Sequence, residues 1–184
     1  MRRLIYGMST SLDGYVEGPD GKFEWTVPDD ELFRHFVAQT AYMTTSLYGR
    51  RMWETMSSYW PAALHDPSLP PLRREYARLW CAVEHVVFSR TLQSVDHGAR
   101  LVRGDAVEEV RRLKAGEGPD LEVSGPGLAS TLLEAGLVDE VQAYVGGATL
   151  GGGKRFLPPG MRLKLLGVTT FSGGVVQLRY EPRR

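Results

Sequence analysis

A glycine followed at once by two arginines stands near residue 50, in the run LYGRRMWE that spans residues 47–54. The apolar residues before Gly49 predict a strand, and those after it predict a helix whose first turn carries Arg50 and Arg51. The free N–H groups of a helix start attract anions, and guanidinium groups add bidentate contacts to phosphate. Two arginines are otherwise unfavourable at the positive end of a helix dipole. The run therefore indicates a phosphate site, although a plain strand–helix turn with solvated arginines is an equally good interpretation.

A second predicted strand, near residues 85–89, ends in Ser89 and Arg90. These side chains should lie at the carboxyl edge of a sheet, where open α/β sheets bind their ligands. Hydroxyl and guanidinium groups can both hold a phosphate. Taken alone, an ordinary polar strand end is the simpler interpretation.

A third predicted strand runs through Ser124 into Gly125-Pro126-Gly127 and then into a helix that continues from Leu128. Glycines allow a pyrophosphate to approach the backbone closely, and the helix start then faces it. A tight strand–helix turn explains the glycines about as well. The distribution of the three strand ends favours the functional interpretation, because a dinucleotide carries several phosphates and needs several such sites.

The long loop from Leu12 to Pro28 and the helix start behind it hold two more candidates. Asp30 could hold or protonate a nitrogen heterocycle, whereas stabilisation of the helix dipole is the stronger interpretation on physical grounds alone. Trp25 could close a pocket over a planar substrate or fill the core. A glycine-rich loop with two cations, TLGGGKRF at 149–156, could bind a phosphate or a sugar, or form only a wide turn.

Charge and composition exclude several classes of function. The 184 residues include 22 Lys plus Arg and 22 Asp plus Glu, so the formal net charge is zero. Nucleic-acid binders usually carry a basic excess, and no nucleic acid is expected as a partner. The four histidines show no metal-ligand spacing, and the single Cys81 cannot build a thiolate-rich zinc site, so no metal is expected. The chain has no G-x-S-x-G elbow and no P-loop, so hydrolase and P-loop interpretations have no support.

The expected compartment is the cytoplasm. One thiol cannot form an internal disulfide, which fits a reducing environment. The N-terminus lacks the apolar run of a signal peptide, and no stretch approaches the roughly 18 apolar residues of a membrane span. No membrane partner is therefore expected.

The elements that must position these residues alternate along the chain. Strands are predicted at residues 4–9, 41–48, 85–89, 100–102, 120–124 and 138–145. One helix is predicted to begin with Pro28 in its first turn, and others are predicted at residues 50–58, 72–80, 106–114 and 128–135. Segments 163–170 and 175–180 flank Ser172-Gly173-Gly174 and predict an antiparallel hairpin. The pattern indicates one α/β domain over residues 1–184, with a largely parallel sheet that ends in this hairpin.

The predicted hairpin also bears on assembly. It presents Val168, Phe171, Val175 and Val176 near a sheet edge, and such an edge must be covered. We therefore expect a homodimer.

Two of the motifs resemble those of dihydrofolate reductases. GRRMWE at 49–54 resembles the family motif G-R-x-T-W-E, and Trp25-x-x-Pro28-x-Asp30 is similar to its W-x-x-P-x-D segment. Other landmarks resemble more closely a sister family, the reductase domain of the bifunctional riboflavin-biosynthesis deaminase-reductase. These are SLDG at 11–14, LVDE at 137–140, and LGGG at 150–153 followed by Phe156. The resemblance covers residues 4–180 and implies a dihydrofolate-reductase-like three-layer αβα fold.

The resemblance also implies a role for each candidate residue, with NADPH as the cofactor. Its expected contacts are Gly49, Arg50 and Arg51 at the helix facing the phosphates, Ser89 and Arg90 at the adenosine 2′-phosphate, Gly125, Pro126, Gly127 and Leu128 at the pyrophosphate, and Ser9 and Val16 beside the nicotinamide. On the substrate side, Asp30 would be the catalytic residue and Trp25 a substrate contact.

The sequence departs from the family patterns in three places. Met52 stands where the folate enzymes carry threonine, Pro126 replaces one glycine of their doublet, and the spacing from Asp30 to Gly49 is longer. The zinc deaminase half of the riboflavin enzyme, with its H-x-E and P-C-x-x-C motifs, has no counterpart in this sequence.

The function that the resemblance implies is NADPH-dependent reduction of the 5-amino-6-(5-phosphoribosylamino)uracil type. Hydride would pass to a small heterocyclic or ribosylaminopyrimidine substrate. Dihydrofolate reduction is the alternative within this class. From another class, the fold could serve as a non-catalytic, nucleotide-binding homodimeric module.

Overall fold

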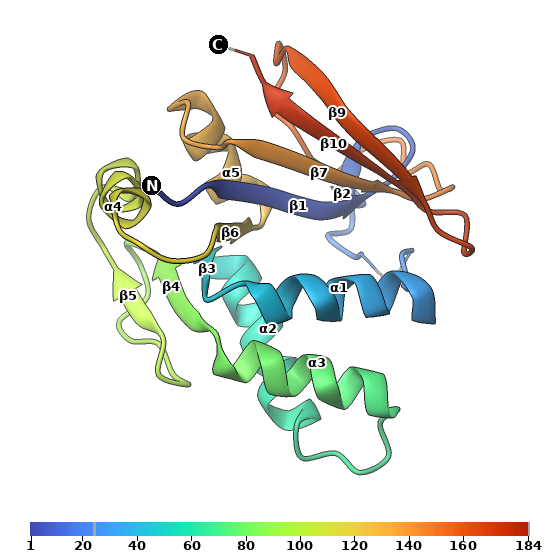
Figure 1. Ribbon diagram of the computed structural model, residues 1–184, viewed down its shortest axis with the longest axis horizontal. Coiled ribbons are helices and arrows are strands. Elements are labelled where there is room, and N and C mark those ends of the chain that lie inside the picture. Colours follow the sequence, from blue (N-terminus) through green and yellow to red (C-terminus); the bar gives the residue numbers. More distant parts are fainter. Residues whose placement is uncertain (24, 184) are drawn as a thin grey trace.

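The computed structural model describes residues 1–23 and 25–183 (Figure 1). In chain order the elements are β1 (Leu4–Thr10), β2 (Tyr15–Glu17), α1 (Asp30–Tyr42), β3 (Thr45–Gly49), α2 (Arg50–Ala63), α3 (Pro71–Ala82), β4 (Glu84–Phe88), β5 (Arg100–Val102), α4 (Ala106–Ala115), β6 (Leu121–Ser124), α5 (Pro126–Glu134), β7 (Glu140–Val145), β8 (Lys154–Arg155), β9 (Leu163–Thr170) and β10 (Val176–Pro182).

Eight of these strands form one sheet in the order β5-β4-β3-β6-β1-β7-β10-β9. The strands from β5 to β7 are parallel to their neighbours, whereas β10 pairs antiparallel with both β7 and β9. Parallel neighbours need a long connection, which contains helices everywhere except between β4 and β5, where residues 89–99 form a loop. The predicted parallel sheet with an antiparallel C-terminal hairpin is therefore confirmed.

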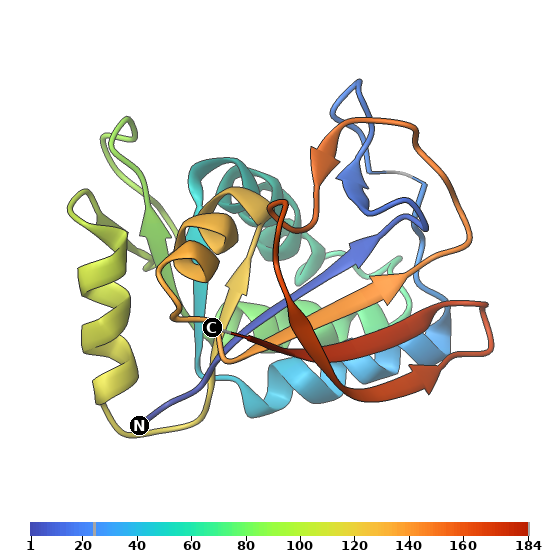
Figure 2. The ribbon, with the colours of Figure 1, turned by 90° about the horizontal axis from the view of Figure 1, so that it is seen from above.

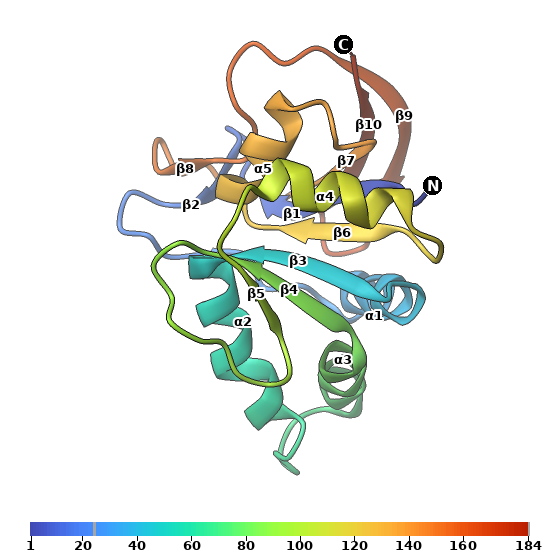
Figure 3. The same ribbon diagram turned by 90° about the vertical axis from the view of Figure 1, so that its left-hand side faces the viewer.

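Helices cover both faces of this sheet, which confirms the predicted three-layer αβα fold. Figure 3 shows α1, α2 and α3 on one face and α4 and α5 on the other. Strands β2 and β8 pair antiparallel in a second, small sheet. Seen from above, this pair lies beyond the carboxyl ends of β1 and β7 (Figure 2).

Each face of the sheet buries its own apolar core. On the face of α4 and α5, Leu4 and Tyr6 of β1 are fully buried in the larger cluster. On the opposite face, the rings of Trp53 and Trp80 stack at 5.8 Å beside Tyr48. Alternation of side chains along each strand explains why one sheet can serve both cores.

The structure corrects several predicted boundaries. The strand expected at residues 41–48 is shorter, because α1 continues to Tyr42 and pairing with β4 and β6 begins only at Thr45. Helix α2 extends past the expected end at Ser58 to Ala63. The loop expected from Leu12 to Pro28 contains β2.

Two further features differ from the expectations. Pro28 precedes the helix rather than lying in its first turn, because α1 begins at Asp30 behind the N-cap residue Asp29. Phe171 does not lie open at the sheet edge, since it is buried against Leu32 and Tyr144. Among residues 1–23 and 25–183, no helix is long and apolar enough to cross a bilayer.

Candidate functional site

The strands β3 and β6 lie side by side at the centre of the sheet and run parallel, with Tyr48 opposite Ser124. From β3 the chain continues through α2 and α3 to β4, on one side of this pair. From β6 it continues through α5 to β7, on the other side. The connections therefore diverge at the carboxyl ends of β3 and β6, and open α/β sheets bind ligands outside such a switch point.

The turns after these two strands pack against each other, and both are glycine turns. Gly125 has a φ of 99°, and a Cβ added there would lie 3.1 Å from the Cβ of Met52 at the start of α2. A Cβ added at Gly49 would lie 3.7 Å from the Cβ of Leu128 in α5. Only glycine adopts the φ of residue 125 without strain, so the close approach of the two helix starts requires it.

The starts of α2 and α5 lack a side-chain cap. Their N-cap residues, Gly49 and Gly125, make no side-chain hydrogen bond. Pro126 removes one N–H donor at the first position of α5, and those of Gly127 and Leu128 follow. A Cβ added at Gly127 would meet nothing within 4 Å. Uncapped N–H groups beside open space fit a bound phosphate, so these residues suit the cofactor that the resemblance implies.

The two arginines at the start of α2 differ in their partners. Arg50 is half exposed, and its Nε lies 4.0 Å from Glu54 one turn later. A terminal nitrogen of Arg51 lies 3.2 Å from Glu17 of β2. Arg51 therefore ties the small sheet to α2, whereas Arg50 keeps only a distant surface partner.

The end of β4 adjoins the same edge, because Phe88 pairs with Gly49 and Ser89 follows it. The Oγ of Ser89 accepts hydrogen bonds from the backbone N–H groups of Thr91 (3.2 Å) and Leu92 (3.1 Å). Ser89 thus closes its own turn, and Arg90 beside it is exposed. A phosphate contact from this turn would come most directly from the Arg90 guanidinium.

The residues expected beside the nicotinamide come from β1 and β2. Ser9 is half-buried on β1, one strand beyond β6 in the sheet. Val16 is buried at the centre of β2, and its carbonyl accepts a hydrogen bond of 3.4 Å from Trp25 Nε1. Trp25 also packs against Gly146 after β7, where an added Cβ would lie 3.3 Å from its ring. The structure therefore brings Val16 and Trp25 together.

The predicted residues follow one line along the carboxyl edge: Ser89 and Arg90 after β4, Gly49 and Arg50 after β3, the Gly125 turn after β6, and Ser9 on β1. These four strands are consecutive neighbours, so the line spans three strand spacings, roughly 14 Å. A cavity of about 770 Å³ lies instead at the opposite edge, near Arg3, where Val138 and Asp139 of the LVDE motif line it but none of the residues expected to bind the cofactor does.

Comparison with known proteins identifies the family of this chain. The family described as the RibD C-terminal domain matches residues 2–177. The chain belongs to this family. It is a homologue of reductase domains, and this homology supports an oxidoreductase activity.

Three proteins illustrate the relationship. The uncharacterized protein YyaP of Bacillus subtilis (strain 168) is 33% identical over 98% of this chain and 95% of that protein. A diaminohydroxyphosphoribosylaminopyrimidine deaminase/5-amino-6-(5-phosphoribosylamino)uracil reductase of Thermotoga maritima has a TM-score of 0.65 at 16% identity, over 99% of this chain and 57% of that chain. An Enterococcus faecalis dihydrofolate reductase complexed with NADP(H) has a TM-score of 0.67 at 16% identity, over 99% and 97% of the two chains. The two solved structures share the fold.

In this RibD C-terminal domain, two of the sequence landmarks bind each other. Asp13 of the SLDG motif accepts hydrogen bonds from the N–H groups of Leu150 (3.0 Å) and Gly151 (2.7 Å) in the glycine-rich loop. Ser11 donates a hydrogen bond of 2.6 Å to the same carboxylate. These bonds lower the pKa of Asp13 to about 2, led by the one from Ser11. Sequence reasoning treated the two motifs separately and missed that one anchors the other.

Asp30 lies at the first position of α1 and not in a closed pocket. Its side chain is 85% exposed, and one oxygen lies 3.9 Å from Arg34 one turn later. Asp29, rather than Asp30, caps the helix by accepting a hydrogen bond of 2.8 Å from the N–H of Leu32. The role of Asp30 on a substrate stays a prediction.

Sequence reasoning also missed a polar cluster between α1 and the sheet. It joins His35 and Gln39 of α1 to Gln142 and Tyr144 of β7. The sequence does contain a signal for this cluster, because polar residues alternate with apolar ones from Glu140 to Val145. Alternation of this kind places the polar side chains on one face of the strand.

Proposed function

We propose that this protein is an NADPH-dependent reductase that transfers hydride to a small heterocyclic or ribosylaminopyrimidine substrate. The reaction type is that of 5-amino-6-(5-phosphoribosylamino)uracil reduction, which the name of the Thermotoga relative states for that protein. The Enterococcus relative is a reductase complexed with NADP(H). With one cysteine, Cys81, the chain suits a reducing compartment such as the cytoplasm.

The observation that carries the proposal is the switch point between β3 and β6. Two helices begin there behind glycines, with no side-chain cap on either. A pyrophosphate would accept hydrogen bonds from the free N–H groups of both helix starts, and the Arg50 side chain would add a positive charge. Arg90 would hold the adenosine 2′-phosphate, and Ser9 and Val16 would flank the nicotinamide.

The protein's part in the reaction is to hold the cofactor and the substrate and to exclude water from them. A bound nicotinamide supplies the hydride. The helix starts and arginines would fix the phosphates of the cofactor, and its ring end would then lie along the edge beside β1. Val16 and Trp25 form an apolar wall there and would exclude water from the substrate side. Asp30 and Trp25 are the proposed substrate contacts.

Cofactor choice and turnover test the proposal together. NADPH should bind more tightly than NADH by about 1.5–3 kcal/mol for each charge-assisted contact to the 2′-phosphate, as measured by fluorescence titration. NADPH oxidation is then followed with 5-amino-6-(5-phosphoribosylamino)uracil and, separately, with dihydrofolate. Turnover of the first supports the proposal, and turnover of the second alone assigns the folate reaction instead. Tight NADPH binding without turnover of either substrate would favour the non-catalytic nucleotide-binding module.

We also propose that the protein is a homodimer. Strand β9 is the edge of the sheet, and Leu165 (52% exposed), Leu166 (43%) and Val168 (54%) lie open on it. An apolar edge of this kind invites pairing, and a second copy offers the same edge. Sedimentation analysis should give a dimer at micromolar concentration, and a mass of one chain at high micromolar concentration would contradict this.

A further inference from the structure

A chain of hydrogen bonds runs between α1 and the sheet, and it starts at a buried carboxylate. The side chain of Glu140 on β7 is 1% exposed and is bound by Arg179 at 2.6 Å and 3.0 Å and by Arg3 at 2.6 Å. Burial alone would raise the pKa of this carboxyl, but hydrogen bonds from Arg179, Arg3 and Gln142 lower it to about 2. Glu140 is therefore ionised and can only accept hydrogen bonds.

The carboxylate fixes the orientation of the amides that follow. Gln142 must present its Nε2 to Glu140 (2.8 Å), so its Oε1 accepts, taking hydrogen bonds from Gln39 (2.8 Å) and Gln177 (3.2 Å). Since Gln39 donates through its Nε2, its own Oε1 must accept as well. The hydroxyl of Tyr144 lies 2.9 Å from this Oε1 and 3.1 Å from that of Gln142. The single hydrogen of Tyr144 therefore goes to an amide oxygen.

The same reasoning fixes the tautomer of His35. With its hydrogen used, the Tyr144 oxygen can only accept, and it does so from Gln177 Nε2 at 3.0 Å. His35 Nε2 lies 3.0 Å from this oxygen and must therefore carry the hydrogen of that bond. In the neutral imidazole, Nδ1 then carries no hydrogen and has an available lone pair. Among the residues that the structure describes, no hydrogen bond engages Nδ1.

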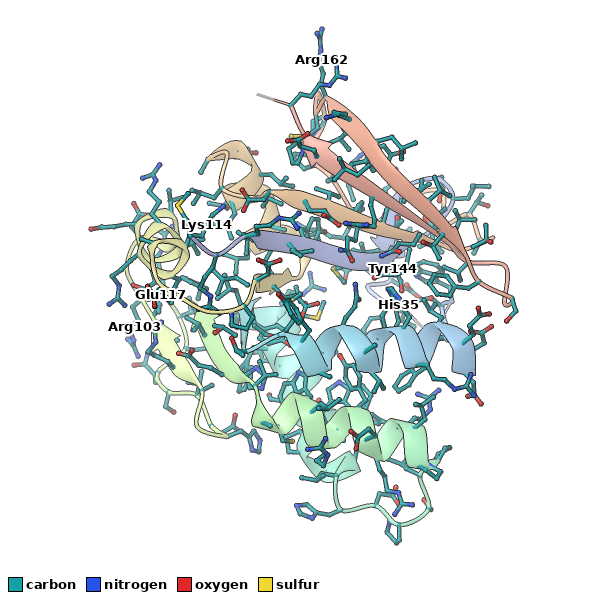
Figure 4. All side chains as sticks on the ribbon, viewed as in Figure 1. His35, Arg103, Lys114, Glu117, Tyr144 and Arg162 are labelled. Carbon is teal, nitrogen blue, oxygen red and sulfur yellow. The ribbon has the colours of Figure 1, made fainter. Side chains whose placement is uncertain are left out.

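This histidine is linked through Tyr144 to β1, the strand that carries Ser9 of the proposed nicotinamide site. Figure 4 shows His35 on α1 next to Tyr144 on β7, and Tyr144 pairs in register with Ser9 of β1. Two residues before Ser9 on β1, Gly7 faces the same side, where an added Cβ would lie 3.8 Å from the Tyr144 ring. Beyond Ile5, the small residues Gly7 and Ser9 leave the α1 side of β1 without a large side chain. The ring of Phe171 packs edge-on against His35 at 5.2 Å and fixes its plane.

We propose that His35 is the proton donor of the reduction, acting through Nδ1, with Tyr144 as the residue that positions it. The inference rests on the proposed function. Hydride reaches the carbon of a C=N or C=O bond, and the heteroatom gains the electron pair of that bond. The Nδ1–H bond of the imidazolium breaks, its proton joins the heteroatom, and His35 becomes neutral with its Nε2–H still on Tyr144. Solvent then restores the imidazolium.

The charged groups around His35 are engaged elsewhere or exposed to solvent, so none of them holds the Nδ1 proton. On α1, Glu31 lies one turn earlier and is engaged by the N–H of Ser172 at 2.8 Å, and Arg34 is exposed. From β10, Arg179 is held by Glu140. Partial burial lowers the pKa of His35 below its usual value near 6.5, and burial raises that of Tyr144 well above 10, so only His35 titrates here near neutral pH.

The first test reads the histidine directly, by nitrogen-15 imidazole spectra of the full chain. His35 is assigned by the signal that His35→Gln removes. We expect the Nε2–H tautomer, a pKa below 6.5, and a shift of the signal on addition of NADP⁺. Tyr144→Phe should weaken the tautomer preference. An Nδ1–H tautomer, or no response to NADP⁺, overturns the inference.

The second test is kinetic, with NADPH and 5-amino-6-(5-phosphoribosylamino)uracil. Gln at residue 35 can still donate to Tyr144 but cannot be protonated, so His35→Gln should lower kcat by about 100-fold or more and leave NADPH affinity within about twofold. In the wild type, kcat/KM should fall as pH rises through the pKa of His35, and this fall should vanish in the variant. His65→Gln, at an exposed histidine, is the matched control and should change neither. An unchanged kcat or pH profile in His35→Gln overturns the inference.

The two tests separate this inference from the proposed function. If the wild type does not turn over the uracil substrate, the proposed function fails, and the imidazole spectra alone then decide the state and placement of His35. If turnover is present and the spectra show the wrong tautomer, the function stands and the inference on His35 fails.

Discussion

The starts of four helices, α1, α2, α4 and α5, are of two kinds. Helices α1 and α4 begin behind Asp29 and Asp105, whose carboxylates accept hydrogen bonds of 2.8 Å from the N–H groups of their first turns. Helices α2 and α5 begin behind Gly49 and Gly125, which supply no side-chain acceptor. The glycine starts lie together at the centre of the sheet, and α4 follows the edge strand β5.

The difference separates stability from binding. An aspartate cap stabilises a helix by about 1 kcal/mol relative to alanine, and it places negative charge on the N–H groups that a phosphate would use. A glycine at the N-cap costs only a few tenths of a kcal/mol relative to aspartate, and it leaves these N–H groups open to an anion. The comparison therefore suggests that α2 and α5 forgo a side-chain cap because an anion supplies it, whereas α1 and α4 have no such partner.

The largest effect should come from giving α2 the kind of cap that α4 has. Gly49 has an ordinary φ of −79°, and a Cβ there would lie 3.7 Å from Leu128, so Gly49→Asp should fold with unchanged or slightly raised stability. The carboxylate would occupy the helix start and repel phosphate, which should weaken NADPH binding by about 100-fold. Gly49→Ala, which adds only the methyl group, is the matched control and should keep most of the affinity. Equal losses in both variants would point to a steric effect and against an anion site.

A smaller loss should follow from filling the space beside α5. A side chain at Gly127 meets nothing within 4 Å, so Gly127→Val should fold but block a pyrophosphate from the helix start. We expect NADPH affinity to fall by about 10- to 30-fold, because Pro126 already limits the number of backbone donors there. Gly167→Val on strand β9, a position equally open, is the control. Unchanged affinity in a well-folded Gly127→Val would show that this turn is only structural.

The third effect is expected at Arg90, an exposed residue that follows β4 at one end of the row of candidate residues along the carboxyl edge of the sheet. Arg90→Ala should weaken NADPH binding by about tenfold and leave NADH binding unchanged, since only NADPH carries the 2′-phosphate. Parallel titrations of both cofactors give the ratio. A wild-type protein that binds the two equally would remove the assignment of Arg90 altogether.

The two glycine starts could be read from the sequence because their signal is local. A buried strand, a glycine and a helix follow one another within a few residues around Gly49 and around Gly125, and the structure has all three parts at both places. The alternation of strands and helices also fixes the parallel sheet, since parallel neighbours need long connections. What was local in the chain was therefore predictable.

The polar cluster and the anchoring of the glycine-rich loop were harder to predict, because they depend on contacts between distant segments. Asp30 was expected to act because of its place in a motif, yet the helix boundary lies so that Asp29 caps and Asp30 is exposed. The pairing of β2 with β8 joins residues more than 130 positions apart, and Asp13 holds that loop. The proposed role of Tyr144 depends on its hydrogen bond to His35, which lies 109 positions away in the chain, and on its register with Ser9.

The fourth prediction concerns a capped start. Asp105→Ala removes the acceptor for the N–H of Val107 and should lower the free energy of unfolding by about 1 kcal/mol, a fall in Tm of about 2–4 °C for a chain of this size. NADPH affinity should be unchanged, since the α4 start offers no anion site. Thermal melts and cofactor titration of the same sample check both parts. A clear loss of NADPH affinity would mean that the capped and glycine starts do not differ in function.

The smallest effect is expected at Asp30, on the other capped start. Its carboxylate is 85% exposed and lies 3.9 Å from Arg34, so Asp30→Asn should lower stability by only a few tenths of a kcal/mol and leave NADPH affinity unchanged. If Asp30 contacts the substrate as proposed, KM should rise while the loss in kcat stays below about tenfold, because an exposed group is well screened by solvent. The comparison with His35→Gln then ranks the two residues in one assay. A larger fall in kcat for Asp30→Asn than for His35→Gln would make Asp30 the proton donor and reduce His35 to a packing role.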